Sequence, residues 1–234
     1  MIPIKQVLRS SVGKKFIMAG TGLGLVIFLI LHLLGNLLLY VPGGVAFNEY
    51  AHKLHSFGAL TLLGEVGLVG VIFIHAVLAI KIKLSNMSAR PEGYGKYVTK
   101  GGPSKWNLAS VNMAVTGVLL LAFIVLHIWH LRFGPAIEQG YSTLVNGAPS
   151  RDLYRLVFES FKNPMFVGIY CSAMIFVGFH LRHGFWSAFQ SLGLMRPRFS
   201  AAIYTLGLLL ALILAAGFFG IPLYIYFVLP GALV

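Results

Sequence analysis

The stretch TGVLLLAFIVLHIWHLR, residues 116–132, decides the fold, because it joins an apolar run of membrane length to histidine. A helix needs about 20 mainly apolar residues to cross the hydrocarbon core of a bilayer. Lipid offers an imidazole no hydrogen-bonding partner, so an ionisable residue at that depth indicates a functional site. Three other apolar segments also carry histidine, namely His32, His75, and His180 with His183. We therefore expect these side chains to bind a group that lies between the helices.

Composition places the whole chain in a membrane. Of its 234 residues 58% are hydrophobic and 10% are charged, whereas a soluble domain carries about 25% charged residues. We expect an all-α integral membrane protein with one transmembrane domain over residues 1–234. The net charge of +12 does not predict nucleic-acid binding, because the cations flank apolar segments, where topology and lipid account for them.

Five segments are predicted to span the bilayer: residues 16–40, 63–82, 111–131, 165–188 and 201–229. A short helix is expected near residues 152–161, residues 41–62 and 83–110 are expected to be loops, and no internal repeat is expected. The three segments on the N-terminal side carry thirteen Lys and Arg, and the opposite loops carry five. The positive-inside rule then places the N-terminus in the cytoplasm and the C-terminus outside.

The expected depths of the four histidines in the membrane group them into two pairs. With about 1.5 Å of rise per residue, His32 and His127 both lie about 24 Å from the cytoplasmic ends of their helices. His75 and His180 lie on helices that run the other way, about 10–13 Å from the cytoplasmic ends. We therefore expect two bis-histidine sites, an outer one with His32 and His127, and an inner one with His75 and His180.

Two axial imidazoles suit haem b, whose iron then has no open position and transfers single electrons. Zinc usually takes four ligands, and these segments hold almost no carboxylate. Hydrogen bonds between helices are the structural alternative. Glycines in the first four segments would make room for a macrocycle or would only allow close helix packing: Gly20, Gly22, Gly24, Gly67, Gly70, Gly117, Gly168 and Gly178.

Two of the histidines have a neighbour three residues along the same helix. His127 is followed by His130, and His180 by His183, so spacing alone leaves the binding member of each pair open. His130 and His183 lie closer to the interface, where they and Arg182 are candidates for hydrogen bonding to a haem propionate.

The chain resembles a family, the single-subunit, di-haem cytochrome b membrane anchors of succinate dehydrogenases and fumarate reductases. The resemblance covers all five segments and is carried by four stretches: Thr21-Gly22 with His32, His75-Ala76 through Lys81, Thr116-Gly117 through His127, and His180-Leu-Arg-His-Gly184-Phe-Trp186. It implies that helices I–IV form a di-haem four-helix bundle with helix V peripheral.

The resemblance also implies ligands. It makes His32 and His127 the axial ligands of the outer (distal) haem, and His75 and His180 those of the inner (proximal) haem. It thereby chooses His127 over His130, and His180 over His183. A glutamate that some fumarate reductases place two residues before the inner ligand is Gly178 here, so a proton pathway of that type is not expected.

The family implies an electron-transfer function in the respiratory chain and the tricarboxylic acid cycle. A partner flavoprotein would oxidise succinate, and an iron–sulfur subunit would pass electrons through two haems b to a quinone, usually menaquinone. The implied location is a bacterial or archaeal cytoplasmic membrane, and the whole complex could form a higher oligomer. The reverse reaction, as in a quinol:fumarate reductase, is equally compatible with these residues.

A quinone site needs polar groups beside an apolar slot. The inner candidates are Ser11, Lys14, Trp106 and Asn107, and the outer ones are Glu49, His52 and His55. Two other functions are alternatives: the cytochrome b subunit of a hydrogenase, formate dehydrogenase or nitrate reductase, and a non-redox, proton-coupled transporter whose histidines relay protons.

Overall fold

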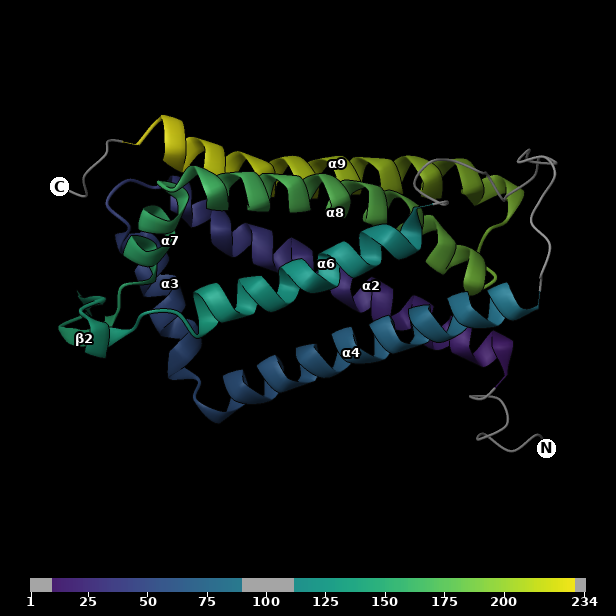
Figure 1. Ribbon diagram of the computed structural model, residues 1–234, viewed down its shortest axis with the longest axis horizontal. Helices are drawn as coiled ribbons and strands as arrows, with labels where there is room; N and C mark the ends of the chain where they lie inside the picture. The colour runs from purple at the N-terminus through teal and green to yellow at the C-terminus, as the bar shows by residue number, and fades with distance from the viewer. Residues whose placement is uncertain (1–9, 90–111, 230–234) are drawn as a thin grey trace. The chain divides into compact units, whose positions relative to one another are not determined.

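The computed structural model describes residues 10–89 and 112–229. Within these ranges, five helices are long and apolar enough to cross a membrane. They are built from α2 (Ser11–Asn36), α4 (Ala59–Ser88), α6 (Met113–His127), α8 (Pro164–Ser191) and α9 (Pro197–Phe227) (Figure 1). The expectation of a helical membrane protein with five spanning segments is confirmed at this level.

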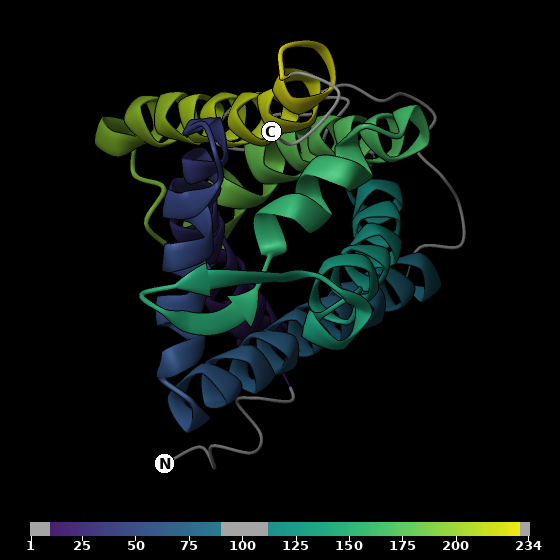
Figure 2. The ribbon, with the colours of Figure 1, turned by 90° about the vertical axis from the view of Figure 1, so that its left-hand side faces the viewer.

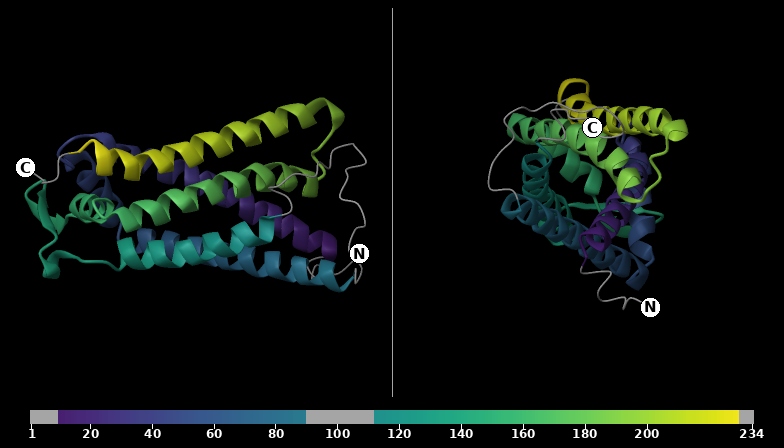
Figure 3. Two further views of the ribbon diagram at one scale, coloured as in Figure 1. Left: turned by 45° about the horizontal axis from the view of Figure 1, so that its top comes forward. Right: turned by 90° about the vertical axis from the view of Figure 1, so that its right-hand side faces the viewer.

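Some helix ends differ from the expected bounds, since α2 begins at Ser11 and not at residue 16, and α4 covers Ala59–Ser88 and not residues 63–82. A 3₁₀ turn, η1 (Leu37–Tyr40), continues α2, and a π-helical turn, η2 (Ile128–Arg132), continues α6. Helix α9 begins at a proline, which suits a first turn because the N–H that proline lacks would have no partner there. Between α8 and α9 the chain turns at Gly193, whose φ of 73° favours glycine (Figure 3).

The chain divides into two compact units, and each spanning helix contributes a part to both. Unit 1 comprises Met1–Phe28, Gly67–Val118 and Val177–Leu212, and unit 2 comprises Leu29–Val66, Leu119–Phe176 and Ile213–Val234. Thirteen of the eighteen Lys and Arg lie in unit 1 with only one of the six acids. Unit 2 holds five of each sign, so the entire net charge of +12 belongs to unit 1.

In unit 1 the buried residues lie mainly on α8. Leu181, Phe185 and Trp186 are all at most 8% exposed. Helix α9 packs closely on this face, since a Cβ on Gly207 would lie 3.0 Å from the Phe185 ring. The glycine therefore lets the two helices approach.

Unit 2 adds a polar cap outside the spanning helices. It consists of α3 (Val45–Ser56), η3 (Ile137–Gln139), β1 (Ser142–Val145), β2 (Ala148–Arg151) and α7 (Leu153–Phe161) (Figure 2). Helix α7 confirms the short helix expected near residues 152–161, whereas α3 occupies a segment expected to be a loop. The antiparallel hairpin turns at Asn146 and Gly147, both with positive φ, as a two-residue type I′ turn requires.

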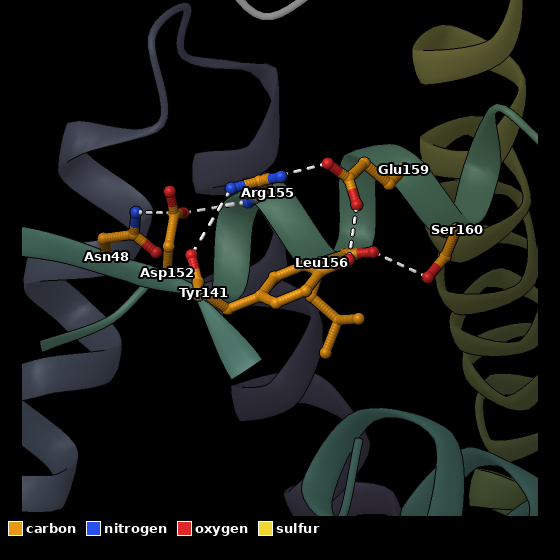
Figure 4. Close-up of polar contacts among 8 residues, drawn as sticks. Asn48, Tyr141, Asp152, Arg155, Leu156, Glu159 and Ser160 are labelled. Atoms are coloured by element: carbon orange, nitrogen blue, oxygen red, sulfur yellow. Dashed lines mark hydrogen bonds and ion pairs between the residues drawn. The ribbon is translucent and has the colours of Figure 1, made fainter. Parts of the chain in front are cut away.

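One asparagine joins α3 to α7. The buried Asn48 donates from Nδ2 to Asp152 Oδ1 at 2.8 Å (Figure 4). Its Oδ1 accepts from the Tyr154 N–H at 2.9 Å. Asp152 is also the N-cap of α7, because its carboxylate accepts from the Arg155 N–H at 2.9 Å. The hydrogen-bonded Asn48 amide thus fixes the start of α7 against α3.

Helix α9 is held tightly within unit 2. Leu214 and Ile225 are its fully buried side chains, and a Cβ on Gly217 would lie 2.7 Å from Leu33. At the helix end, Lys162 Nζ donates to the Leu229 carbonyl at 2.7 Å. A lysine suits this place, because the last carbonyls of a helix lack partners and carry partial negative charge.

The cap should respond to acid through Glu159. Its carboxylate accepts from the Tyr141 hydroxyl at 2.5 Å and from Arg155 Nε at 2.7 Å. These two bonds, the first most strongly, lower the pKa of Glu159 from its ordinary value of 4.5. A lowered folded-state pKa stabilises the fold above pH 4.5, and that contribution is lost as the pH falls through the lowered value.

We therefore expect the thermal unfolding midpoint of the detergent-solubilised protein to fall on acidification below pH 4.5 less steeply in Glu159→Gln than in the native chain. Glutamine keeps an accepting oxygen but cannot ionise. Parallel pH profiles for the two proteins would show that this carboxylate does not stabilise the cap.

Candidate functional site

The first histidine pair lies in unit 2. His32 comes from α2, His127 is the last residue of α6, and their ring centroids are 5.9 Å apart with planes at 87°. Aromatic rings flank both imidazoles: Phe218 of α9 lies 5.6 Å from His32, and Phe123 lies 5.7 Å from His127. The structure thus brings together the two residues predicted for the outer site.

The second pair lies in unit 1. His75 of α4 and His180 of α8 have ring centroids 6.4 Å apart with planes at 63°. Each Nδ1 faces a threonine hydroxyl on a neighbouring helix, Thr21 at 3.1 Å from His75 and Thr116 at 3.3 Å from His180. The two residues predicted for the inner site are therefore also neighbours.

The centroid separations favour one kind of bridge. Two imidazoles on opposite sides of one metal have centroids about 6.2 Å apart, since each bond is about 2 Å and each nitrogen lies about 1.1 Å from its centroid. A direct N–H···N hydrogen bond of about 3 Å would bring the centroids to about 5.2 Å. The observed 5.9 and 6.4 Å lie nearer the metal-bridged value. Both pairs therefore fit the axial ligands of a haem iron.

Zinc fits these residues less well than haem does. Structural zinc takes four protein ligands and catalytic zinc usually three. Across residues 10–89 and 112–229, no group of three or more His, Cys, Asp or Glu side chains could hold a metal ion. A pair of imidazoles can hold an iron where a macrocycle supplies the remaining ligands, as in haem.

Close helix packing does not explain most of the glycines in these helices. A Cβ would meet nothing within 4 Å at five of the positions predicted from the sequence: Gly20, Gly24, Gly67, Gly70 and Gly168. Gly22 and Gly117 differ, because a Cβ there would lie 3.3 Å from the His75 ring and 3.5 Å from the His180 ring. The macrocycle interpretation of the five open positions stays a prediction.

His130 is fully engaged by protein groups. The Ser160 hydroxyl donates to the Leu156 carbonyl at 2.6 Å, so its oxygen is free to accept from His130 Nε2 at 3.0 Å. His130 Nδ1 then accepts from the Tyr170 hydroxyl at 3.3 Å, and its ring stacks on Phe166 at 4.1 Å. Since both nitrogens have partners, the geometry favours His127 as the metal-binding member of this close pair.

His183 and Arg182, the other propionate candidates, lie on α8 in unit 1. The His183 ring meets Trp186 edge-on at 4.9 Å, and its buried Nδ1 has no hydrogen-bond partner among the described residues. Arg182 is exposed. Neither arrangement tests the propionate role, which stays a prediction.

The quinone candidates on the inner side are only partly described. Ser11 is exposed at the start of α2, and Lys14 is half-buried one turn later. Trp106 and Asn107 lie outside the described residues. The structure therefore neither groups nor separates this set.

The outer quinone candidates all lie on α3, but they have different surroundings. Glu49 is exposed, and His52 Nδ1 lies 3.0 Å from the Ser150 hydroxyl of β2. His55 lines a small pocket of about 80 Å³. The same pocket is lined by Glu65 and Arg132, which form a two-pronged ion pair with distances of 3.0 and 3.1 Å.

Some neighbours of the histidines were not predicted from the sequence. Phe218 and Tyr170 lie on other helices, and no local pattern marks them. Thr21 and Thr116 did carry a signal, because Thr-Gly followed by nine residues and His occurs twice, at residues 21–32 and 116–127. The expectation of no internal repeat overlooked this match.

Comparisons with family models, curated proteins and solved structures found no match to this chain. Over residues 10–89 and 112–229 the fold is that of a mainly helical protein with five helices long and apolar enough to cross a membrane. Any assignment of function beyond this class is therefore argued from the histidine pairs and their surroundings.

The bond between Ser160 and His130 should contribute to stability. Ser160→Ala would leave His130 Nε2, a polar atom inside the protein, without its partner, which costs about 1 to 3 kcal/mol. We expect the free energy of unfolding in detergent to fall by about that amount. Ser56→Ala is the control, since that exposed hydroxyl bonds only its own helix. Equal effects of the two substitutions would argue against a role for Ser160 in holding His130.

Proposed function

We propose that this protein is the di-haem cytochrome b membrane anchor of a succinate:quinone oxidoreductase. His32 and His127 would hold the outer haem b, and His75 and His180 the inner one. A haem iron with both axial positions filled by histidine supplies one-electron transfer and leaves no site for oxygen or substrate. The dicarboxylate chemistry would take place on a partner flavoprotein.

One observation carries the proposal: four histidines on four spanning helices form two pairs, each at a centroid separation that suits a single bridging metal. A proton relay would need imidazoles close enough for direct hydrogen bonds or bridging water, and would not need two matched pairs. The duplication into two matched pairs therefore supports haem over the transporter alternative.

What surrounds each pair also supports the proposal. This chain's own part is to hold the imidazoles in place within low-dielectric surroundings, which it does with the Thr21 and Thr116 hydroxyls and with the Phe123 and Phe218 rings. Preorganised ligands need little rearrangement when the charge of a bound group changes.

The partners rest on the sequence resemblance. An iron–sulfur subunit would dock on the cytoplasmic side, where the positive-inside rule places the N-terminus and the cations of unit 1. A menaquinone headgroup would meet either Ser11 and Lys14 or the pocket beside His55. His55 lines that pocket together with Glu65 and Arg132.

The haem content tests the proposal directly. We expect the purified chain to bind two low-spin haems b, counted by pyridine haemochrome against protein concentration. His75→Ala should retain one haem, because its partner His180 cannot hold the iron alone. A native chain with one haem or none would contradict the proposal.

His130→Ala is the matched control for the ligand assignment. It removes an imidazole three residues from His127 whose nitrogens already have protein partners. We expect this variant to keep both haems, whereas His127→Ala should lose the outer one. The opposite pattern would make His130 the ligand.

Co-purifying subunits test the choice of partner enzyme. From mildly solubilised native membranes we expect the chain to bring down a flavoprotein with covalent flavin and an iron–sulfur protein, with succinate:quinone reductase activity. A molybdenum or nickel enzyme in the same fraction would support the formate dehydrogenase, nitrate reductase or hydrogenase alternative. In His75→Ala complexes, quinone reduction should fall while succinate oxidation by a soluble dye persists.

A further inference from the structure

Two segments of the chain repeat one pattern. TGLGLVIFLILH, residues 21–32 of α2, and TGVLLLAFIVLH, residues 116–127 of α6, agree at six of twelve positions, including Thr, Gly and the final His. The histidine of each copy belongs to the pair in unit 2, whereas the Thr-Gly of each copy lies in unit 1. The final histidine of each copy thus belongs to the outer pair, whereas the threonine of each copy lies beside a histidine of the inner pair.

The first threonine fixes a proton position. Thr21 Oγ1 lies 2.8 Å from the Ile17 carbonyl and 3.0 Å from the Met18 carbonyl, and a hydroxyl has one hydrogen to donate. Threonine in a helix commonly donates its hydroxyl hydrogen to such a carbonyl, which leaves its oxygen able to accept from His75 Nδ1, 3.1 Å away. Nδ1 of His75 then carries the proton, and Nε2 is unprotonated and able to bind a metal.

The second threonine repeats the arrangement. Thr116 Oγ1 lies 3.1 Å from both the Asn112 and the Met113 carbonyls, and 3.3 Å from His180 Nδ1. Thr116 is also buried, with 5% of its surface exposed, so no water competes for its oxygen. The same reasoning leaves Nε2 of His180 unprotonated.

The glycine beside each threonine gives the imidazole room. A Cβ on Gly22 would lie 3.3 Å from His75 Cε1, closer than most such contacts, and one on Gly117 would lie 3.5 Å from His180 Cε1. Gly24 offers a comparison on the same helix, because a Cβ there meets nothing within 4 Å. At about 100° per residue, Gly24 lies on the side of α2 opposite to Gly22.

We propose that Thr21-Gly22 and Thr116-Gly117 are positioning residues of the inner pair. Each threonine hydroxyl accepts the Nδ1 proton of the inner histidine, and each glycine admits its ring, so that Nε2 faces the iron. The inference deepens the proposed function and rests on it. It is specific to the inner pair, since neither threonine has a described hydrogen bond to the outer histidines: His32 Nδ1 lies 3.4 Å from Asn36 Nδ2, and His127 Nδ1 is buried without a hydrogen-bond partner among the described residues.

The consequence is electronic as well as steric. An acceptor on the N–H of a ligating imidazole makes the other nitrogen a stronger donor, which stabilises the oxidised metal. Removing the threonine hydroxyl should therefore raise the midpoint potential of the inner haem. The outer haem should not respond, because neither threonine contacts His32 or His127 in a described hydrogen bond.

The test uses Thr21→Val and Thr116→Val in the whole chain with its native partner subunits. Redox titration and the electron paramagnetic resonance signals of the two ferric haems are the readouts, and neither depends on activity. We expect one of the two haems to show a raised midpoint and a shifted signal, and the other to stay unchanged. Thr21→Ser and Thr116→Ser should restore the native values. Thr205→Val, an exposed position on α9, is the control.

The outcomes separate the two claims. A native chain without two haems overturns the proposed function. Two haems in the native chain, with potentials and signals unaltered in both valine variants, overturn the positioning role alone. If the valine variants do not fold, Gly22→Ala is compared with Gly64→Ala, because a Cβ on Gly64 of α4 meets nothing within 4 Å and Gly64 is not among the glycines predicted to make room for a macrocycle. A shifted inner-haem signal only in Gly22→Ala supports the inference, and no difference between them overturns it.

Discussion

Everything in this structure depends on the cost of placing an imidazole where no water can reach it. A ring nitrogen in hydrocarbon must find a partner inside the protein, so each histidine of the spanning helices constrains its neighbours. The protein meets this demand for several of these rings, while Nδ1 of His127 and Nδ1 of His183 have no hydrogen-bond partner among the described residues. His75 and His180 face threonine hydroxyls, His130 lies between Ser160 and Tyr170, and His127 faces a second imidazole.

Much of the fold is predictable from the sequence, because membrane spans are set by long apolar runs, and five such runs are present. The cap was harder to predict. Helix α3 has a polar sequence after Pro42-Gly43-Gly44, which is typical of a loop, and it is stabilised by the distant Asn48–Asp152 hydrogen bond. The hairpin did have a local signal in Asn146-Gly147, since both residues adopt positive φ.

The candidate site, like the fold, has some features that the sequence predicts and others that it does not. Helix direction and rise alone pair His32 with His127 and His75 with His180, because depth depends only on residue count. Which groups surround each ring depends on helix packing, and so Phe218 could not be predicted. The choice between His127 and His130 needed the contacts of Ser160, which lies on α7 outside the spanning helices. Spacing three residues apart on one helix cannot make that choice.

The π-helical turn after His127 has a consequence for how this protein can vary. A π turn is wider than an α turn, so residues after it are rotated relative to the helix that precedes it. His130 and Arg132 lie in this turn and contact Ser160 of the cap and Glu65 of α4, whereas His127 is the last residue of α6. The direction of the side chains at residues 128–132 is therefore not fixed by the rotation of α6 about its axis. Insertions or exchanges in the extramembrane cap can then be absorbed at Ile128–Arg132 without turning the imidazole of His127 away from its partner.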